Sequence, residues 1–411
     1  MTDFVKLRQD ANKIIEQAIA HSLPAPAVKA ALKARPPKGR IHMLSLGKAG
    51  WHMARAAHEV LGDSIAQGMV ITKHGHSEGA LSNFDIFEGG HPIPDIHSIN
   101  ATQAAINMAR SLGHGDELLF MISGGGSALF EAPVDGISLE DIMQLTEALL
   151  ASGADITEIN AIRKRLSTVK GGRFAELCAP AHVRAIILSD VLGDRLDSIA
   201  SGPTVLDKTT CEEAFAILDK YRITPKPHII NALNQETPKA VNNSDIEVVG
   251  SVSILCEAAA TAAAALGYKP NIITSSLDCE ANEAGRFMAA IARDAAPMTA
   301  IIAGGETVVR LTGNGKGGRN QQLALAAARG IADKGILLLS LGSDGTDGPT
   351  DAAGGMVDGQ SLNKLKTKGI NLDKALENND AYNALAAIDG LIKTGPTGTN
   401  VNDVIIALTE K

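Results

Sequence analysis

The chain has 411 residues, which predicts two domains because a single hydrophobic core rarely extends over so many. Hydrophobic residues make up 45% and charged residues 20%, as in ordinary globular proteins, and the net charge of −8 argues against a nucleic-acid partner. No apolar run reaches the roughly 18 residues of a membrane span, and the N-terminus lacks a signal-peptide pattern. The four cysteines are scattered without metal-type spacing. We therefore expect a soluble cytoplasmic α/β protein with reduced thiols and neither a nucleic-acid nor a membrane partner.

Helical and extended patterns alternate along the first half of the chain. Apolar residues at helical spacing predict a helix over 3–35, which a Pro-Pro pair then ends. Short apolar runs, which suit strands buried on both faces, follow at 41–46, 68–72, 118–122 and 183–188. Helices are expected at 51–61, 98–112 and 139–152. This alternation is typical of parallel strands covered by helices.

A polar stretch rich in Pro and Asn at 222–245 predicts the domain boundary. Beyond it, strands are expected at 246–250, 270–274, 299–303, 336–341 and 404–408, with Ala-rich helices at 256–266, 280–294 and 320–333. We expect two α/β/α domains with mostly parallel sheets, a Rossmann-like N-terminal domain (1–238) and a C-terminal domain (239–411), the last segment being free to pack back on the N-terminal domain.

The strand at 118–122 runs directly into a loop of five small residues, Ser123, Gly124, Gly125, Gly126 and Ser127. Glycines lack Cβ atoms, so the backbone can turn sharply and direct several N–H groups to one point, while the serines add hydroxyl groups. Loops of this kind after buried strands are where open α/β sheets bind anions. We expect the five residues to bind a phosphate or carboxylate; a tight turn without a ligand is the alternative.

Charged side chains follow other strands of the first half. Lys48 follows the strand at 41–46 in a Gly-Lys-Ala-Gly turn, where it either reaches a phosphate or is only solvated. Asp190 follows the strand at 183–188, and carboxylates at such strand ends point into the crevice of an open sheet. His91 lies in a polar loop before the helix at 98–112, in a cleft or in solvent.

The segment 157–174 is the most basic part of the chain. Four of its polar side chains are expected along one side of a helix and its exit, where they would help to hold a negatively charged substrate: Asn160, Arg163, Lys164 and Lys170. A solvated helix face is the alternative.

The C-terminal half has polar loops of its own. The loop 313–322 is rich in glycine and supplies the cation Arg319 and its neighbour Asn320. Three aspartates lie within eight residues at 344–351, and carboxylates are ligands that Mg²⁺ prefers. The predicted metal ligands are Glu306, Asp344, Asp347 and Asp351; aspartates that cap their own backbone are the alternative.

Together these residues suit phosphoryl transfer, which needs cations on the phosphate, a bridging metal and a positioned acceptor hydroxyl. Lys48 and Arg319 would supply the cations, and Asp190 would orient the hydroxyl or take its proton. Because the parts lie in both halves, the active site is expected in a cleft between two domains whose closure excludes water. The alternatives are a nicotinamide-dependent dehydrogenase, for which the Gly-Lys-Ala-Gly turn lacks the dinucleotide fingerprint, and a non-catalytic binding protein.

The ordered set of motifs resembles the type-II glycerate kinases, which have an N-terminal glycerate-kinase domain and a C-terminal MOFRL domain. The resemblance runs nearly end to end and rests on Gly47-Lys-Ala-Gly50, Gly90-His-Pro92, Ser123-Gly-Gly-Gly-Ser127, Glu158-Ile-Asn160 with Arg163-Lys164, Lys170-Gly-Gly172, Ser189-Asp190-Val191, Ser201-Gly-Pro-Thr204, Gly304-Gly-Glu-Thr307, Gly318-Arg-Asn-Gln321, Asp347-Gly-Pro-Thr-Asp-Ala-Ala-Gly354 and Thr397-Gly-Thr-Asn400.

The resemblance implies ATP- and Mg²⁺-dependent phosphorylation of D-glycerate at its 2-hydroxyl, giving 2-phosphoglycerate and ADP. A monomer or homodimer is expected. It places Lys48 and Arg319 at positions of phosphate-handling cations and Asp190 at a catalytic acidic position. One departure is Gln322, where the family pattern has glutamate, so no carboxylate role is assigned there. Family members are also labelled hydroxypyruvate reductases, so an NAD(P)-dependent hydroxypyruvate reductase is the alternative function.

Overall fold

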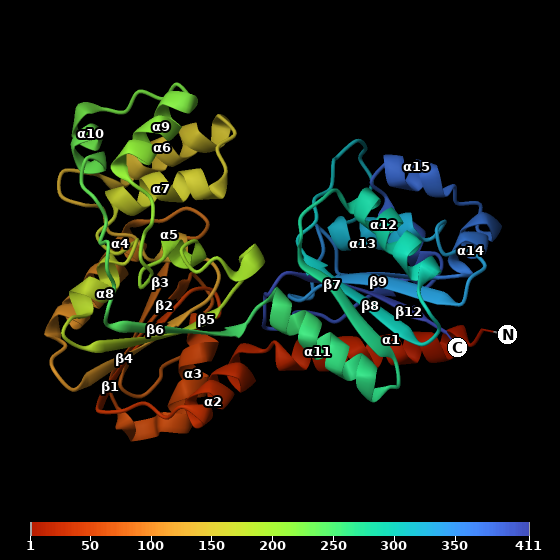
Figure 1. Cartoon of the computed structure of the whole chain (residues 1–411), viewed down its shortest axis with the longest axis horizontal. Helices are drawn as coiled ribbons and strands as arrows, with labels where there is room; N and C mark the ends of the chain where they lie inside the picture. The colour runs from red at the N-terminus through yellow and green to blue at the C-terminus, as the bar shows by residue number, and fades with distance from the viewer. Residues whose placement is uncertain (1, 411) are drawn as a thin grey trace. The chain divides into compact units, whose positions relative to one another are not determined.

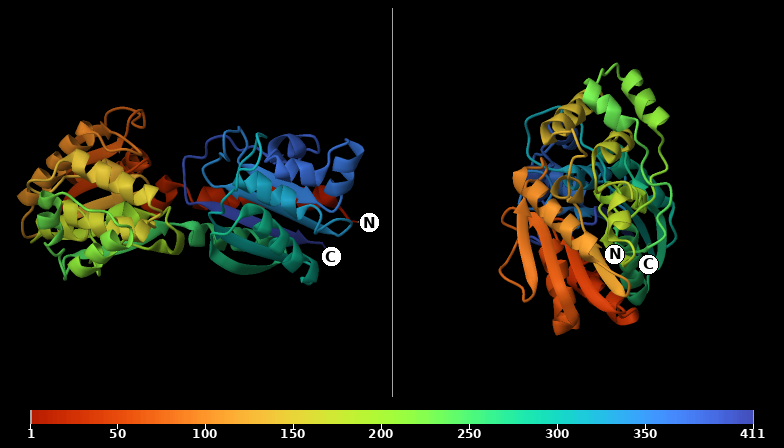
Figure 2. Two further views of the ribbon diagram at one scale, coloured as in Figure 1. Left: turned by 90° about the horizontal axis from the view of Figure 1, so that it is seen from above. Right: turned by 90° about the vertical axis from the view of Figure 1, so that its left-hand side faces the viewer.

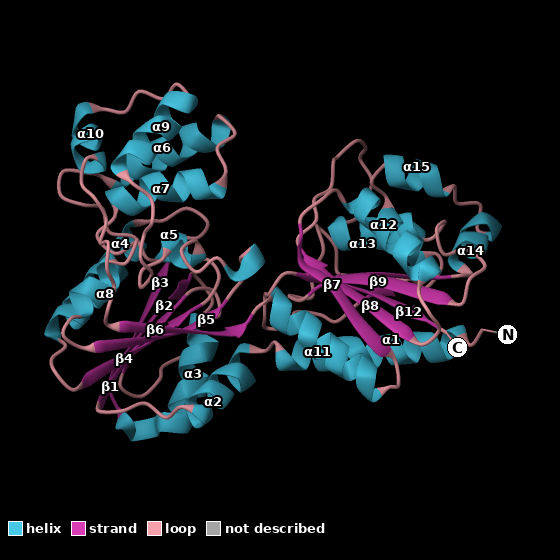
Figure 3. Cartoon of the chain, in the orientation of Figure 1, coloured by secondary structure: helices cyan, strands magenta, loops and turns pink. Residues whose placement is uncertain are grey.

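A computed structural model describes residues 2–410, apart from the side chain of Asp194. The chain forms two compact units: Pro24–Val249 make up the N-terminal unit, and Met1–Leu23 with Gly250–Lys411 make up the C-terminal unit. Each unit is a β-sheet covered by helices on both faces (Figures 1 and 3), which confirms the predicted α/β class with two sheets. Among residues 2–410, no helix is both long and apolar enough to cross a membrane.

The N-terminal unit contains nine α-helices within the described residues: α2 (Pro24–Ala34), α3 (Gly50–Leu61), α4 (Ile96–Ser111), α5 (Gly126–Leu129), α6 (Leu139–Ala151), α7 (Ile156–Leu166), α8 (Arg173–Cys178), α9 (Cys211–Lys220) and α10 (Pro227–Leu233). Its strands are β1 (Arg40–Leu46), β2 (Ile65–Lys73), β3 (Phe84–Gly89), β4 (Asp116–Ile122), β5 (His182–Leu188) and β6 (Ser244–Gly250).

These strands form a sheet in the order β3-β2-β1-β4-β5-β6, and β1 to β5 pair in parallel. This is the strand order of dinucleotide-binding Rossmann folds. Six of the seven residues of β4 and of β5 are buried, because α3 packs on β1 and β2 while α4 and α8 pack against the sheet from its other face (Figure 1). Burial on both faces explains why these strands read as continuous apolar runs.

Four helices of this unit, α6, α7, α9 and α10, form a separate cluster beyond the sheet (Figure 1). They share a small core of their own, which includes Ile142, Leu149, Ile159, Leu218 and Leu233. Helix α7 carries the basic residues of the sequence and contacts the short helical turn η3 (Ile199–Ser201). The cluster therefore positions the basic segment near the loops of the sheet.

The C-terminal unit contains seven α-helices within the described residues: α1 (Phe4–His21), α11 (Val252–Ala265), α12 (Ala281–Asp294), α13 (Arg319–Ala327), α14 (Ser361–Thr367), α15 (Leu372–Glu377) and α16 (Ala381–Ala386). Its strands are β7 (Lys269–Leu277), β8 (Thr299–Gly305), β9 (Ile336–Gly342), β10 (Gly354–Asp358), β11 (Leu391–Ile392) and β12 (Asp403–Thr409).

The second sheet has the order β11-β10-β9-β12-β8-β7 and is mixed. Strand β12 pairs antiparallel with both β8 and β9, so these two neighbours run in the same direction, as does β7. Helices α1 and α11 pack together on one face, while α12 and α13 cover the other. Because β12 is antiparallel to both neighbours, its first residue, Asp403, lies at the edge of the sheet where β8 and β9 end.

The two units differ in extent from the predicted domains 1–238 and 239–411. The expected helix 3–35 is two helices, interrupted at Ser22, because Pro24 begins α2 and cannot continue the hydrogen-bond pattern of α1. Helix α1 belongs with the C-terminal strands, so both ends of the described chain lie in one unit (Figure 2). Strand β6, expected to begin the second half, joins the first sheet, and the last segment forms β12 inside the second sheet.

Candidate active site

The glycine loop after β4, Ser123–Ser127, lies at the point where the order of the first sheet reverses. Strands β1 and β4 are neighbours there, and the chain continues to opposite sides of the sheet after each of them. The two following loops are joined by hydrogen bonds, from Lys48 N to Gly124 O at 2.9 Å and from Ala49 N to Ser123 Oγ at 3.0 Å. Ligands of open α/β sheets bind at such switch points, beyond the carboxyl ends of the strands.

Three of the predicted site residues surround the glycines of this loop. A Cβ atom on Gly124 would overlap the carboxylate of Asp190, and one on Gly125 would lie 2.9 Å from His91 Cδ2 and 3.3 Å from Lys48 Cγ. Gly125 also has a positive φ of 87°, which disfavours other residues. The structure therefore brings Lys48, His91 and Asp190 together at the predicted anion-binding loop.

The backbone of the loop offers donors to a ligand. None of the described residues accepts a hydrogen bond from the N–H groups of Gly125, Gly126 or Ser127. The hydroxyl of Ser123, in contrast, is buried and bonds internally to Leu46 O at 3.1 Å, so Ser123 shapes the loop. Burial is the main cause that lowers the pKa of His91, and the positive charge of Lys48 is the next cause.

Ser127 and Asn160 are joined through Ser201, a residue that the sequence analysis quoted only within a motif. Ser127 Oγ lies 3.1 Å from Ser201 Oγ, which donates to Asn160 Oδ1 at 3.0 Å. Asn160 is 3% exposed, and its Nδ2 has no partner among the described residues. Ser201 and Ala200 both have positive φ angles, 61° and 49°, and such strain is concentrated at functional sites.

The two basic residues predicted on α7 have different surroundings. Arg163 Nη2 donates to Ser127 O at 3.0 Å and to Glu131 Oε2 at 3.2 Å, so Arg163 belongs to the loop. Lys164 is 2% exposed and its Nζ lies within 3.4 Å of Asp197 and Asp207. The structure therefore does not bring Lys164 to the glycine loop.

In the C-terminal unit, Arg319 is held by two carboxylates. Its Nε donates to Asp403 Oδ2 at 2.6 Å, its Nη2 to Asp403 Oδ1 at 3.1 Å, and its Nη1 to Glu306 Oε1 at 2.8 Å. The predicted phosphate ligand Asn320 is 1% exposed and accepts a 2.5 Å hydrogen bond from Ser340. Arg319 is 35% exposed and remains accessible, whereas Asn320 is committed to internal contacts.

Sequence reasoning missed Asp403, the partner of Arg319. The residue begins the apolar run of β12, and a parallel strand would have placed it at the opposite edge of the sheet. Because β12 is antiparallel, Asp403 pairs with Gly305 and Gly342, the last residues of β8 and β9. The signal in the sequence was the polar group Asn400, Asn402 and Asp403 at the start of the strand.

The four predicted metal ligands do not form a ready metal site. Within residues 2–410, no group of three His, Cys, Asp or Glu side chains could hold a metal ion. Glu306 pairs with Arg319, and Asp344 accepts a hydrogen bond from Thr346 N in its own loop. Asp351 pairs with Lys393 at 2.8 Å, and the hydrogen bond from Lys393 is the main cause that lowers the pKa of Asp351 to about 2.

Asp347, the fourth of these residues, caps α13. Its carboxylate accepts hydrogen bonds from Asn320 N at 3.1 Å and from Gln321 N at 2.8 Å. Burial raises the pKa of Asp347 to about 6, and the nearby Asp403 adds to the effect. These carboxylates do not fit a preformed magnesium site, because each of them already has a protein partner.

The departure at Gln322 has a physical explanation. Its amide nitrogen donates to Asn282 Oδ1 at 3.1 Å and to Leu376 O at 2.9 Å, and the side chain is buried. A glutamate at this position would place a carboxylate oxygen against Asn282 Oδ1 and Leu376 O, and these two acceptors would then lose the donor that Gln322 supplies. In this chain, Gln322 therefore helps to hold α13 against its neighbours.

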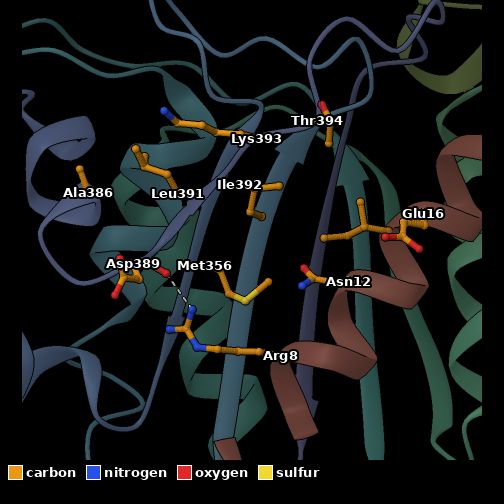
Figure 4. A pocket seen from close by; sticks show the side chains of 11 residues that line it. Arg8, Asn12, Glu16, Met356, Ala386, Asp389, Leu391, Ile392, Lys393 and Thr394 are labelled. Atoms are coloured by element: carbon orange, nitrogen blue, oxygen red, sulfur yellow. Dashed lines mark hydrogen bonds between the residues drawn. The ribbon is translucent and has the colours of Figure 1, made fainter. Parts of the chain in front are cut away.

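A cavity of about 660 Å³ in the C-terminal unit lies between α1 and the β10–β11 edge (Figure 4). Arg8 at its wall donates to Asp358 Oδ2 at 2.7 Å and to Asp389 O at 2.9 Å. Among the described residues that line it, none is a predicted site residue. The glycine loop therefore remains the candidate for chemistry.

The fold and these loops define an α/β enzyme class with a glycine-rich loop at a switch point of its first sheet. A family model described as "Domain of unknown function (DUF4147)" matches residues 10–234, and one described as "MOFRL family" matches residues 299–403. The D-glycerate 2-kinase of Thermotoga maritima is 50% identical, covering 99% of this chain and 100% of the relative. The glycerate 2-kinase of Pyrococcus horikoshii is 44% identical over 90% of this chain and 88% of the relative.

A crystal structure of glycerate kinase from Thermotoga maritima is similar, with a TM-score of 0.95 and 50% identity over 98% of this chain and 99% of that chain. These matches run over both units. The chain belongs to the glycerate kinase family that joins a DUF4147 domain to a MOFRL domain.

Proposed function

We propose that this chain is a glycerate 2-kinase, which transfers the γ-phosphoryl group of ATP to the 2-hydroxyl of D-glycerate and yields 2-phosphoglycerate and ADP. The observation that carries the proposal is the convergence of Lys48, His91 and Asp190 on the glycine loop. The 50% identity to a D-glycerate 2-kinase over 99% of the chain supports the substrate.

We assign the acceptor to the glycine loop because the loop combines anion donors with a carboxylate. Lys48 and the loop N–H groups, which have no acceptor among the described residues, would bind the carboxylate of D-glycerate. Asp190 lies against Gly124, where it would accept a hydrogen bond from the 2-hydroxyl and take its proton as the new P–O bond forms. Water has no such anchor, so the loop selects the acceptor by orienting it.

Lys48 and Arg319 are proposed to stabilise negative charge on the transferring phosphoryl group. Lys48 suits this role because its side chain extends along Gly125. Arg319 suits it because Asp403 and Glu306 hold its guanidinium rigidly, and a preorganised donor needs little reorganisation during the reaction. Asp403 would act by positioning Arg319.

Magnesium, location and assembly stay predictions. Kinases use Mg²⁺ to bridge nucleotide phosphates, but no step is assigned to it here because the predicted carboxylates do not form a site among the described residues. A cytoplasmic location and a monomeric or homodimeric state are likewise expected for the enzyme.

The direct test is a coupled assay of the purified protein with Mg-ATP and D-glycerate, in which NMR identifies the phosphorylated position. ADP release with 2-phosphoglycerate is the expected result. A parallel sample contains hydroxypyruvate with NADH or NADPH, and oxidation of the cofactor without ADP release from the first sample would overturn the kinase in favour of the reductase.

A further inference from the structure

A buried charged group lies directly beneath the glycine loop and consists of Glu131, Arg163 and Lys170. Glu131 Oε2 lies 3.2 Å from Arg163 Nη2 and 3.6 Å from Lys170 Nζ. The side chains of Glu131 and Lys170 are fully buried, and that of Arg163 is 13% exposed. Lys170 and Arg163 belong to the basic segment predicted from the sequence, whereas Glu131 carried no signal in the sequence.

Both cations are tied to the end of the glycine loop. Arg163 Nη2 and Lys170 Nζ donate to the same carbonyl oxygen, that of Ser127, at 3.0 and 2.9 Å. Lys170 also donates to Phe130 O at 2.9 Å. These bonds hold the backbone at the end of the glycine loop in place, on the side where the loop enters α5.

The charges of this group do not cancel. Among the described residues, Glu131 and Arg163 are the charged side chains that face Lys170, so two cations share one carboxylate. Glu131 Oε1 and Arg163 Nε have no hydrogen-bond partner there. A buried surplus of one positive charge is costly for stability, and it is retained next to the loop that we assign to an anion.

We propose that Glu131, Arg163 and Lys170 form a positioning group for the glycine loop, and that a positively charged Lys170 is required for tight binding of the anionic acceptor. Lys170 does not touch the acceptor; it acts through Ser127 and through its field. The proposal rests on the proposed function where it takes D-glycerate as the bound anion.

The group gives the acceptor site a pH dependence. Burial, partly offset by Glu131, lowers the pKa of Lys170 to about 8. Above that pH the amine loses its charge and the surplus disappears. The KM for D-glycerate should then rise and level off about tenfold higher, because the neutral form binds about tenfold more weakly than the protonated form.

The test measures KM for D-glycerate and kcat between pH 6.5 and 10 in the wild type and three variants. Lys170→Met should raise KM about tenfold at pH 7 and remove the alkaline rise. Lys170→Arg should restore a low KM that stays flat to pH 10, since arginine keeps its charge. Glu131→Gln should move the rise to lower pH, because losing the neighbouring negative charge lowers the pKa of Lys170 further.

Arg165→Met is the matched control. Arg165 is a fully buried cation of α7, the helix that also carries Arg163, but it faces Asp207 and Glu236 instead of the loop. This variant should lose stability while keeping the KM and the pH profile of the wild type. If Lys170→Met folds and retains the wild-type KM and alkaline rise, the proposal is overturned.

Binding of inorganic phosphate, followed by isothermal titration calorimetry over the same pH range, separates this proposal from the proposed function. A wild type that does not phosphorylate D-glycerate but binds phosphate with the Lys170-dependent profile contradicts only the glycerate kinase. If Lys170→Met does not fold, the wild type and Glu131→Gln decide the matter, and identical alkaline profiles in these two proteins overturn the positioning group.

Discussion

Arginine and lysine residues predicted to bind phosphate occur in both units, but the ratio of cations to carboxylates around them is opposite. At the glycine loop of the N-terminal unit, Arg163 and Lys170 share the single buried carboxylate Glu131. In the C-terminal unit, Arg319 is paired with both Asp403 and Glu306. The first group therefore has one more positive than negative charge, whereas the carboxylates of the second group outnumber its single cation.

The comparison teaches that a cation in a glycine-rich motif has no fixed role until its partners are known. Burial raises the pKa of Asp403, so this carboxylate depends on Arg319 for compensation. Arg319 thus has a structural task in addition to any catalytic one. In contrast, Lys48 lies against the glycine loop itself, with its Cγ 3.3 Å from the position that a Cβ atom would take on Gly125.

The largest expected effect is that of Lys48→Ala. Removing a preorganised cation from the reacting phosphoryl group should lower kcat/KM by about 10²–10³-fold. The melting temperature should stay within about 1 °C of the wild type, because Lys48 is only partly buried. Steady-state kinetics and calorimetry of both proteins check this, and near-normal turnover would remove Lys48 from the mechanism.

Gly125→Ala tests the close approach of the side chains to the loop. The new Cβ would meet His91 and Lys48, so we expect KM for D-glycerate to rise about tenfold. Gly153→Ala is the control, because Gly153 also has a positive φ, 82°, but nothing lies within 4 Å of its Cβ position. Both variants should lose about 1 kcal/mol of stability from backbone strain, and only Gly125→Ala should change KM. Equal KM values in the two variants would show that the close contact of His91 and Lys48 with Gly125 does not affect binding of D-glycerate.

Arg319→Ala should lower kcat and, unlike Lys48→Ala, also destabilise the fold. Breaking a fully buried ion pair costs about 3–5 kcal/mol, and we expect about 2 kcal/mol because Arg319 is 35% exposed. Adding Asp403→Asn should recover most of that stability without recovering kcat. Urea denaturation of the single and double variants measures both; an unchanged midpoint in Arg319→Ala would contradict the structural task.

The smallest expected effect concerns Asp347, whose pKa is raised to about 6. The folded state binds more protons than the unfolded state between about pH 4 and 6, so stability falls as pH rises through this window. The wild type should lose roughly 2 kcal/mol relative to Asp347→Asn over that range. Denaturation at pH 4, 5 and 6 compares the slopes; parallel slopes would refute the assignment.

Much of the fold is predictable from the sequence because buried strands carry a strong signal. The runs 41–46, 118–122 and 183–188 correspond to β1, β4 and β5, and their loops follow from the strand ends. Strand β3 was missed because five of its six residues are partly exposed or exposed, which weakens the apolar pattern. The assignment of α1 and β6 to units depends on tertiary pairing, which local patterns do not contain.

The site was predictable to the extent that strand ends determine position. Lys48 and Asp190 each follow a predicted strand of the first sheet, and they meet at the loop with His91, which follows β3. Lys164 was misplaced because spacing along a helix does not reveal the buried Asp207 that faces it. Asp403 was missed because the sequence does not show that β12 is antiparallel.

The most direct test of the account is calorimetric titration of D-glycerate into the wild type, Lys48→Ala and Arg319→Ala, without nucleotide, at pH 7. If the acceptor binds at the glycine loop, Lys48→Ala should weaken binding at least tenfold, whereas Arg319→Ala should bind within about twofold of the wild type. The reverse pattern, with binding lost only in Arg319→Ala, would contradict the assignment of the acceptor site to the N-terminal unit.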